Sequence, residues 1–507
     1  MSGFYEGILA TADPMALVFV ALGTAAGLIV GAVPGLNGGM LIALTLPMTF
    51  YMQSTHALFL LVAMYVGAVS GGLVTATLLR IPGTPAGIMT IFDAYPMAQS
   101  GQPGRALGLG IYSSLIGGVI SWVFLATFSP GLARLALNFG PYEYFALSLL
   151  ALVLIVSVTE GALLKGLASG CLGIVLALPG IDPISGQLRL TFGMQWLSSG
   201  FELVAVLIGI FAVSQVLIDV TDRITPVASE GGSWRSMLLR FTDLRQHVVN
   251  FVRSSVIGTF IGILPGLGAN IGSIVAYAAA KNMSHRPQDF GKGSEEGIVA
   301  SETANNATVC GALIPLITLG IPGSINDAIL IGAFIIHNLQ PGPLLFTQSP
   351  EVAYGIIVAA LIDNLFMFAM MIFGVPVFVR MAGIPKALLN PIILVFCFVG
   401  AYAVNNSMHG VWIMLLFGLV GFALVRARMP LGPFVIGLVL APIAEKFLRS
   451  ALMHAADDWS VFVTRPISGS VLAVTLLVLL YAVYREIAAA RGRSQPIMNV
   501  GPSEADT

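Results

Sequence analysis

Polar side chains stand inside apolar stretches at two places in the second half of this chain. Glu302, Asn305 and Asn306 are three and four residues apart, which places them on one face of a helix. Asp327 follows the dipeptide Pro322-Gly323. A carboxylate close to hydrocarbon is costly and usually functional, so these groups could bind a cation such as Na⁺ or carry a proton. We predict ion contacts at Asn305, Asn306, Thr308, Asn326 and Asp327.

The acidic residues also have structural alternatives. Asp327 could cap a helix over residues 328–339, because acidic side chains are favoured at helix N-termini. Glu302 could belong to an ion pair that packs or gates the protein. Upstream of it, Ser294 followed by Glu295 and Glu296 indicates the start of a helix rather than a binding site.

The elements that would position these groups are encoded twice. Residues 27–36 read GLIVGAVPGL and residues 258–267 read GTFIGILPGL, at an offset of 231. The sequence IPGT at 81–84 recurs as IPGS at 321–324, and QPG at 102–104 recurs at 340–342. Three motifs in one order indicate a duplicated unit. Duplicated apolar units with Pro/Gly interruptions at matching places are typical of secondary transporters.

These interruptions could themselves form a binding site. Broken backbone at membrane depth is tolerated only where protein or a water-filled cavity surrounds it. Half-helix N-termini carry partial positive charge and free N–H groups, which suit an anion, and glycine allows a ligand to approach the backbone. The alternative is that Pro and Gly merely kink and pack the helices. We predict substrate contacts at Gly35, Asn37, Gly38, Thr84, Gly266, Asn270 and Ser324.

The composition is that of a membrane protein. Hydrophobic residues make up 57% of the 507 residues and charged residues only 9%, whereas a soluble chain carries about 25% charge. Continuous apolar runs predict an all-α polytopic membrane protein with about 10 to 14 spanning helices plus re-entrant or broken pieces. The net charge of −1, with no basic patch, argues against nucleic acid as a partner.

The widest polar region divides the chain near its middle and contains five arginines, which predicts a cytoplasmic linker. We therefore divide the chain into an N-terminal membrane repeat (1–219), the linker (220–253), a C-terminal membrane repeat (254–486) and a polar tail (487–507). The second PGL segment has basic residues on both flanks and the first has none. This asymmetry predicts two repeats of inverted topology, although each segment could instead span once.

Other function classes find little support. The chain has no H-E-x-x-H motif and no G-x4-G-K-[ST] loop, which argues against a zinc protease and an ATP-binding subunit. We find no nucleophile–base or metal constellation, so we expect no enzyme and no cofactor, with Na⁺ as the coupling ion. An anion channel or a single-component ion-coupled anion transporter is the alternative to ion-driven uptake with partner subunits.

Long segments resemble a known family, the large membrane subunit of the tripartite tricarboxylate transporters. The similarity lies in GAVPGLNGG (31–39), the run 65–108 ending in IPGTPAGIMTIFDAYPMAQSGQPGRALG, GILPGLGANIG (262–272), and the stretch from GSEEGIVASETANNA to LITLGIPGS (293–324). It covers roughly residues 15–450. The resemblance implies a bacterial inner-membrane permease working with a small membrane subunit and a periplasmic solute-binding protein. It also implies uptake of carboxylates such as citrate, driven by a cation gradient, typically Na⁺.

Overall fold

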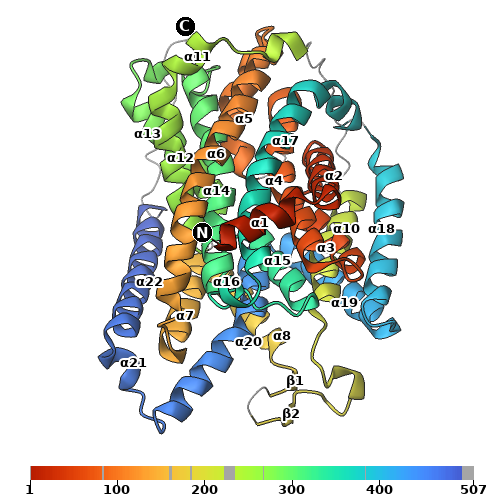
Figure 1. The fold of residues 1–507 in the computed structure, drawn as a ribbon, viewed down its shortest axis with the longest axis vertical. Coiled ribbons are helices and arrows are strands. Elements are labelled where there is room, and N and C mark those ends of the chain that lie inside the picture. The colour runs from red at the N-terminus through yellow and green to blue at the C-terminus, as the bar shows by residue number, and fades with distance from the viewer. Residues whose placement is uncertain are drawn as a thin grey trace, which may run out of the picture.

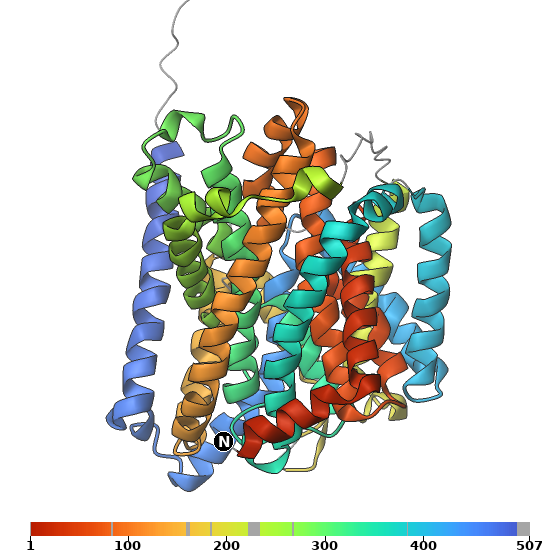
Figure 2. The same cartoon turned by 45° about the horizontal axis from the view of Figure 1, so that its top comes forward.

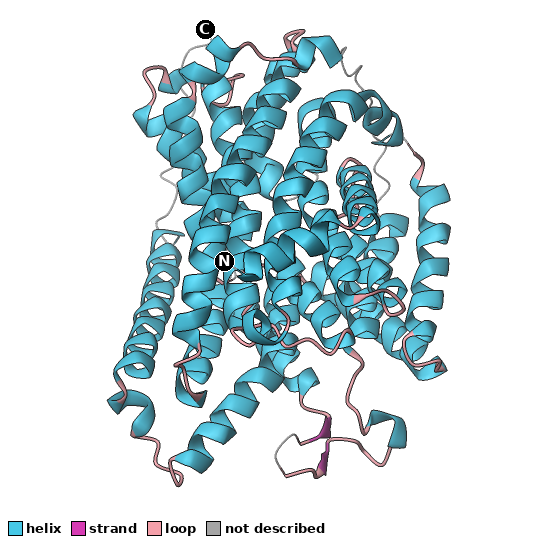
Figure 3. Cartoon of the chain, viewed as in Figure 1, coloured by secondary structure: helices cyan, strands magenta, loops and turns pink. Residues whose placement is uncertain are grey.

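Helices make up nearly all of the computed structural model, which describes residues 2–82, 85–158, 163–182, 185–221, 234–265, 268–382 and 384–493. Over these residues the one sheet is a short antiparallel pair, β1 (Gly180–Ile181) with β2 (Leu188–Arg189) (Figure 3). Nine of the described helices are long and apolar enough to cross a membrane. The predicted all-α polytopic membrane fold is confirmed.

Ten helices precede the middle of the chain (Figure 1). They are α1 (Ser2–Ala12), α2 (Pro14–Gly31), α3 (Gly38–Thr49), α4 (Ser54–Leu79), α5 (Ile88–Gln99), α6 (Pro103–Ala136), α7 (Pro141–Val158), α8 (Leu163–Ala177), α9 (Leu203–Ile208) and α10 (Ser214–Thr221). A single 3₁₀ turn, η1 (Pro85–Gly87), leads into α5, and a π-helical turn over Gly209–Val213 joins α9 to α10.

Twelve helices follow. They are α11 (Phe241–Gln246), α12 (Val248–Ile263), α13 (Gly268–Met283), α14 (Glu295–Leu319), α15 (Ile325–Ile336), α16 (Leu345–Gln348), α17 (Pro350–Ala382), α18 (Lys386–Ala403), α19 (Met408–Arg426), α20 (Leu431–His454), α21 (Val461–Thr464) and α22 (Pro466–Arg493). Helices α10 and α12 reach into the predicted linker 220–253 from either side, and α22 continues into the predicted tail 487–507. The domain boundaries themselves stay predictions.

Both copies of the PGL motif interrupt a helix. In the first copy α2 ends at Gly31 and α3 begins at Gly38. Gly35 lies between them with φ +90°, a left-handed conformation that glycine adopts without strain. Asn37 then caps α3, because its side-chain oxygen accepts the N–H of Met40 at 2.8 Å. In the second copy α12 ends at Ile263 and α13 begins at Gly268.

The duplication extends to the way the helices pack. Helix α2 lies against α4, and α12 lies against α14. At Gly262 of α12 an added Cβ would come within 2.5 Å of the carbonyl oxygen of Thr308, so only glycine allows this approach. Equivalent glycines make equivalent contacts in both repeats, at sequence offsets of 231 for one helix and 240 for the other. The four pairs are Gly31 with Ala68, Gly262 with Thr308, Gly71 with Leu28, and Gly311 with Thr259.

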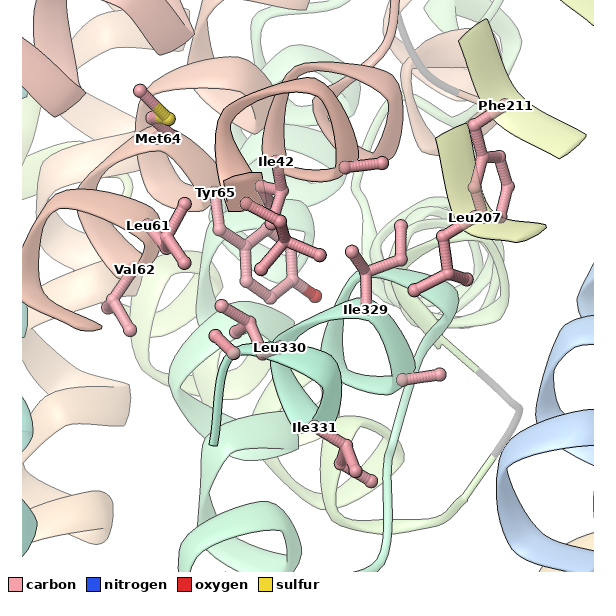
Figure 4. Packing of buried hydrophobic residues seen from close by; sticks show 14 of the residues in the cluster. Ile42, Leu61, Val62, Met64, Tyr65, Leu207, Phe211, Ile329, Leu330 and Ile331 are labelled. Carbon is pink, nitrogen blue, oxygen red and sulfur yellow. The ribbon is translucent and has the colours of Figure 1, made fainter. Parts of the chain in front are cut away.

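The two repeats share one core rather than forming separate bodies. Helix α14 of the second repeat packs against α6 of the first, α3 packs against α15, and α13 packs against η1. The most apolar window of α4 is entirely buried, whereas those of α18 and α22 are 28% and 17% buried, and these two helices lie on opposite flanks of the molecule (Figures 1 and 2). Side chains from α3, α4, α9 and α15 interleave in the core (Figure 4).

Candidate functional site

Two helix N-termini, one from each repeat, meet beside the first break. Asn37 caps α3, and Ser324 caps α15 through a 3.3 Å hydrogen bond that its hydroxyl oxygen accepts from the N–H of Asp327. An added Cβ on Gly39 would lie 3.0 Å from the side-chain oxygen of Asn326 and 3.3 Å from that of Asn37. We call this meeting point of Asn37–Gly39 with Ser324–Asp327 the N-terminal junction. It brings together predicted residues that are nearly 290 positions apart.

Tyr65 also belongs to the N-terminal junction, and sequence reasoning missed it. Its hydroxyl lies 3.0 Å from the hydroxyl of Ser324, and the tyrosine is buried in α4, pointing toward α15 (Figure 4). A tyrosine within an apolar run gives no signal of its own. The repeat offset of 240 would have drawn attention to it, because Tyr65 occupies the position equivalent to Asn305.

Asp327 is fully buried in the first turn of α15. The cap of this helix is Ser324, so Asp327 is not itself the cap, although its carboxylate is favoured by the partial positive charge of the helix N-terminus. Neither carboxylate oxygen has a hydrogen-bond partner among the described residues. A buried carboxylate without donors is costly, so this group can accept a cation or a proton.

Asn306, which we predicted to contact an ion, holds three helices together. Its side-chain oxygen accepts a hydrogen bond from Ser70 of α4 at 2.6 Å. Its amide nitrogen donates to Ser114 of α6 at 2.8 Å and to the backbone oxygen of Glu302 at 3.2 Å. The hydroxyl of Thr308 donates to the backbone oxygen of Ala304 at 2.7 Å. Both predicted ion contacts therefore have protein partners in this structure.

Glu302 and Asn305 differ from Asn306 in this respect. Both are buried in α14. Thr90 of α5, another residue that sequence reasoning missed, donates a 2.5 Å hydrogen bond to one carboxylate oxygen of Glu302. The second carboxylate oxygen and the side-chain oxygen of Asn305 have no partner among the described residues. Two acceptors without donors thus lie one helical turn apart.

Gly35 lies beside an ion pair that the sequence did not reveal. The ammonium of Lys386 is 2.6 Å from the place where a Cβ on Gly35 would lie, and 2.6 Å from a carboxylate oxygen of Asp219. The Asp219 side chain is only 4% exposed. Residues at the ends of apolar segments, as these are, normally read as solvated flanks, and only the fold places them at the tip of the first hairpin.

Three predicted substrate contacts cannot be placed. Thr84 and Gly266 lie outside the described residues, and Asn270 belongs to α13 but its side chain is not described. Across the described residues, no three His, Cys, Asp or Glu side chains gather into a metal-binding group. The oxygen-rich groups present here suit a hard monovalent cation better than a transition metal.

Comparison with known proteins gives two kinds of match. Residues 17–436 match the model of a family described as the tripartite tricarboxylate transporter TctA family. The chain is 35% identical over 496 residues to an "Uncharacterized 52.8 kDa protein in TAR-I ttuC' 3'region" of Agrobacterium vitis, covering 97% of this chain and 98% of that one. It is 36% identical over 234 residues to an "Uncharacterized protein in TAR-II ttuC' 3'region" of the same organism, covering 46% of this chain and 97% of that one. No solved structure matches.

Proposed function

Because this chain belongs to the tripartite tricarboxylate transporter TctA family, we propose that it is the large permease subunit of a binding-protein-dependent carboxylate uptake system. The family is one of transporters, and the chain is a multi-pass protein of the bacterial inner membrane. A tripartite system includes two further components. In our proposal these are a small membrane subunit in the bilayer and a periplasmic solute-binding protein that delivers the carboxylate.

The N-terminal junction is the observation that carries the proposed substrate site. The N-termini of α3 and α15 converge there with the side chains of Asn37, Ser324 and Asn326 around glycine backbone. Free N–H groups and the partial positive charge of helix N-termini favour a carboxylate without a basic side chain. Gly35 and Gly38 would allow close approach, and Thr84, Gly266 and Asn270 would extend the site from the other repeat.

Asp327 gives a physical reason for coupling to a cation. A substrate carboxylate at Ser324 would lie three residues along the chain from a buried carboxylate, and two like charges in a low-dielectric site repel strongly. Na⁺ held by Asp327 and Asn326, with Asn305, Asn306 and Thr308 as further ion contacts, would remove this repulsion. Substrate and Na⁺ would then bind together, which is the condition for symport.

The packing of the repeats supports alternating access by two inverted units. Helix α3 of the first repeat contacts α15 of the second, and α13 of the second contacts η1 of the first. Such reciprocal contacts are expected when two units face each other across a pseudo-two-fold axis. Movement of the hairpin tips against the surrounding scaffold would open the junction first to one side of the membrane and then to the other.

The substrate site can be tested with labelled citrate as the probe in cells that express all three components. We expect Asn37→Ala and Ser324→Ala to lower uptake at least tenfold while membrane insertion stays normal. Asn138→Ala is the matched control, because Asn138 is an exposed asparagine just after α6, and it should transport like the wild type. Full uptake by both junction variants would contradict the proposed site.

A further inference from the structure

The mid-helix carboxylate of Glu302 has an unusual environment. It is the eighth residue of α14, so it lies about 10 Å along the axis from the helix start, beyond the reach of the N-terminal partial charge. It is fully buried. Thr90 donates to one of its oxygens at 2.5 Å, and the other oxygen has no partner among the described residues. Asn305 stands one turn further along, buried, with its side-chain oxygen also unpartnered.

A neighbouring acid illustrates what a self-sufficient buried carboxylate looks like. Asp93 lies on α5, three residues from Thr90. One of its oxygens accepts backbone N–H groups at 2.8, 3.0 and 2.8 Å from the loop 291–294. Its other oxygen accepts the hydroxyl of Tyr277 at 2.8 Å. Asp93 therefore needs no bound cation, whereas Glu302 lacks equivalent donors.

The charged groups on the surrounding helices do not neutralise Glu302. From α6, Arg105 pairs with Glu295, which also faces His247 at 3.4 Å. From α12, Arg253 donates to Asn250 at 2.5 Å. The groups that face Glu302 directly are neutral: the hydroxyls of Thr90 and Ser114 and the amide of Asn305. No basic side chain in the described part of the chain pairs with this carboxylate.

We propose that Glu302 and Asn305 bind a single monovalent cation, Na⁺, and that a proton takes the same carboxylate oxygen when Na⁺ leaves. Both unpartnered groups are oxygen acceptors, as a hard cation requires. The site rests on the proposed cation-driven uptake, and it adds a coupling position distinct from Asp327. Glu302 belongs to the second repeat and Thr90 to the first, so cation binding would act across the contact between the repeats.

The test uses the purified full-length chain in detergent, with Na⁺ alone as the ligand. The thermal unfolding midpoint is measured over a range of Na⁺ concentrations, with choline or K⁺ holding the ionic strength constant. A bound ion raises this midpoint in proportion to its occupancy. For the wild type we expect a Na⁺-specific rise. In the acidic range, the half-saturating Na⁺ concentration should increase by up to about tenfold for each unit fall in pH, since H⁺ competes.

Four variants locate the response. Glu302→Gln keeps the shape and the oxygen that Thr90 contacts, and should abolish both the Na⁺ response and its pH dependence. Asn305→Ala should raise the half-saturating concentration by about tenfold through loss of one charge-assisted contact, and it reads the same site should Glu302→Gln fold poorly. Glu296→Gln, in the first turn of the same helix, should behave like the wild type. Asp327→Asn should retain a Na⁺ response.

The outcomes separate this site from the proposed function. A wild-type Na⁺ response in folded Glu302→Gln, or loss of the response only in Asp327→Asn, would overturn the site while leaving Na⁺-coupled uptake intact. A wild-type protein with no response to Na⁺, together with uptake that ignores the Na⁺ gradient, would overturn the site and the proposed coupling together. Loss in Glu302→Gln with retention in Glu296→Gln supports the site.

Discussion

The hydroxyl of Tyr65 lies 3.0 Å from the hydroxyl of Ser324, which joins the buried helix α4 of the first repeat to the N-terminus of α15 in the second. Both residues are the counterparts of polar residues in the other repeat, Asn305 for Tyr65 and Thr84 for Ser324. The contact therefore links the two copies of the duplicated unit at the place where we propose that substrate binds.

Replacing this tyrosine should affect transport more than stability. Tyr65→Phe removes one hydrogen bond, which costs about 0.5–1.5 kcal/mol, and frees the Ser324 hydroxyl to rotate. We expect citrate uptake to show a raised KM with a small fall in the thermal midpoint. Tyr144→Phe is the control, since Tyr144 donates to the backbone oxygen of Ala136 at 3.1 Å away from the junction. Equal effects of both variants on KM would refute a role for Tyr65 in the site.

The close contact between α12 and α14 should not tolerate a side chain at Gly262. A Cβ there would lie 2.5 Å from the carbonyl oxygen of Thr308 and 3.0 Å from the N–H nitrogen of Ala312, and neither backbone atom can easily give way. Gly262→Val should lower the free energy of unfolding by at least about 1–3 kcal/mol and reduce the folded yield. Yield and thermal midpoint in detergent measure this.

Gly131→Ala provides the comparison for that substitution. Gly131 lies in α6 with nothing within 4 Å of an added Cβ. Alanine is a better helix former than glycine, so this variant should be unchanged or stabilised by up to about 1 kcal/mol. A Gly262 variant as stable as this control would show that the tight helix contact is not needed.

The carboxylate of Asp93 should be essential for the loop between α13 and α14. Hydrogen bonds to a charged group contribute about 1.5–3 kcal/mol each, and Asp93 accepts four. Asp93→Ala should therefore destabilise the protein by at least about 3 kcal/mol and expose the loop to protease, while Asp93→Asn should lose roughly half as much. Asp289→Asn, at an exposed acid of the same region, should change neither. Protease resistance of Asp93→Ala would disprove this role.

The sequence was sufficient for the membrane class, the duplication and the helix breaks, because hydropathy and Pro/Gly motifs are local properties. It was not sufficient for partners across repeats. Nothing near Asn306 in the chain indicates Ser70 and Ser114, and nothing near Glu302 indicates Thr90, because these contacts depend on how α14 packs against α4, α5 and α6. The repeat offset located Tyr65 only once its contact with Ser324 was known.

The pair between Arg189 and Glu445 attaches the β1–β2 hairpin to α20. Arg189 donates to both carboxylate oxygens at 2.5 and 2.6 Å, a planar geometry that lysine cannot reproduce. Arg189→Lys should therefore speed limited proteolysis of the hairpin, whereas Lys165→Arg, at an exposed lysine that contacts only the backbone oxygen of Ala427, should not. Unchanged cleavage in Arg189→Lys would mean that the hairpin is held by other contacts.

This attachment should be insensitive to alkaline pH. Hydrogen bonds from the Glu445 carboxylate raise the pKa of Arg189. A raised folded-state pKa gives stability that is present below the unfolded value and is lost only as the pH rises through the folded value, which for arginine is far above neutrality. Protection of the hairpin should thus be equal at pH 7 and pH 9. A loss of protection over this range would contradict the assignment.

The central claim is that the chain couples carboxylate uptake to a cation gradient. Its most direct measurement is the accumulation of citrate in proteoliposomes that contain both membrane subunits and receive the periplasmic partner, with an inward Na⁺ gradient that monensin can collapse. The account predicts accumulation above the external concentration that is lost when the Na⁺ gradient is collapsed. Accumulation that persists without any imposed Na⁺ or H⁺ gradient, or conductive flux that only runs downhill, would contradict it.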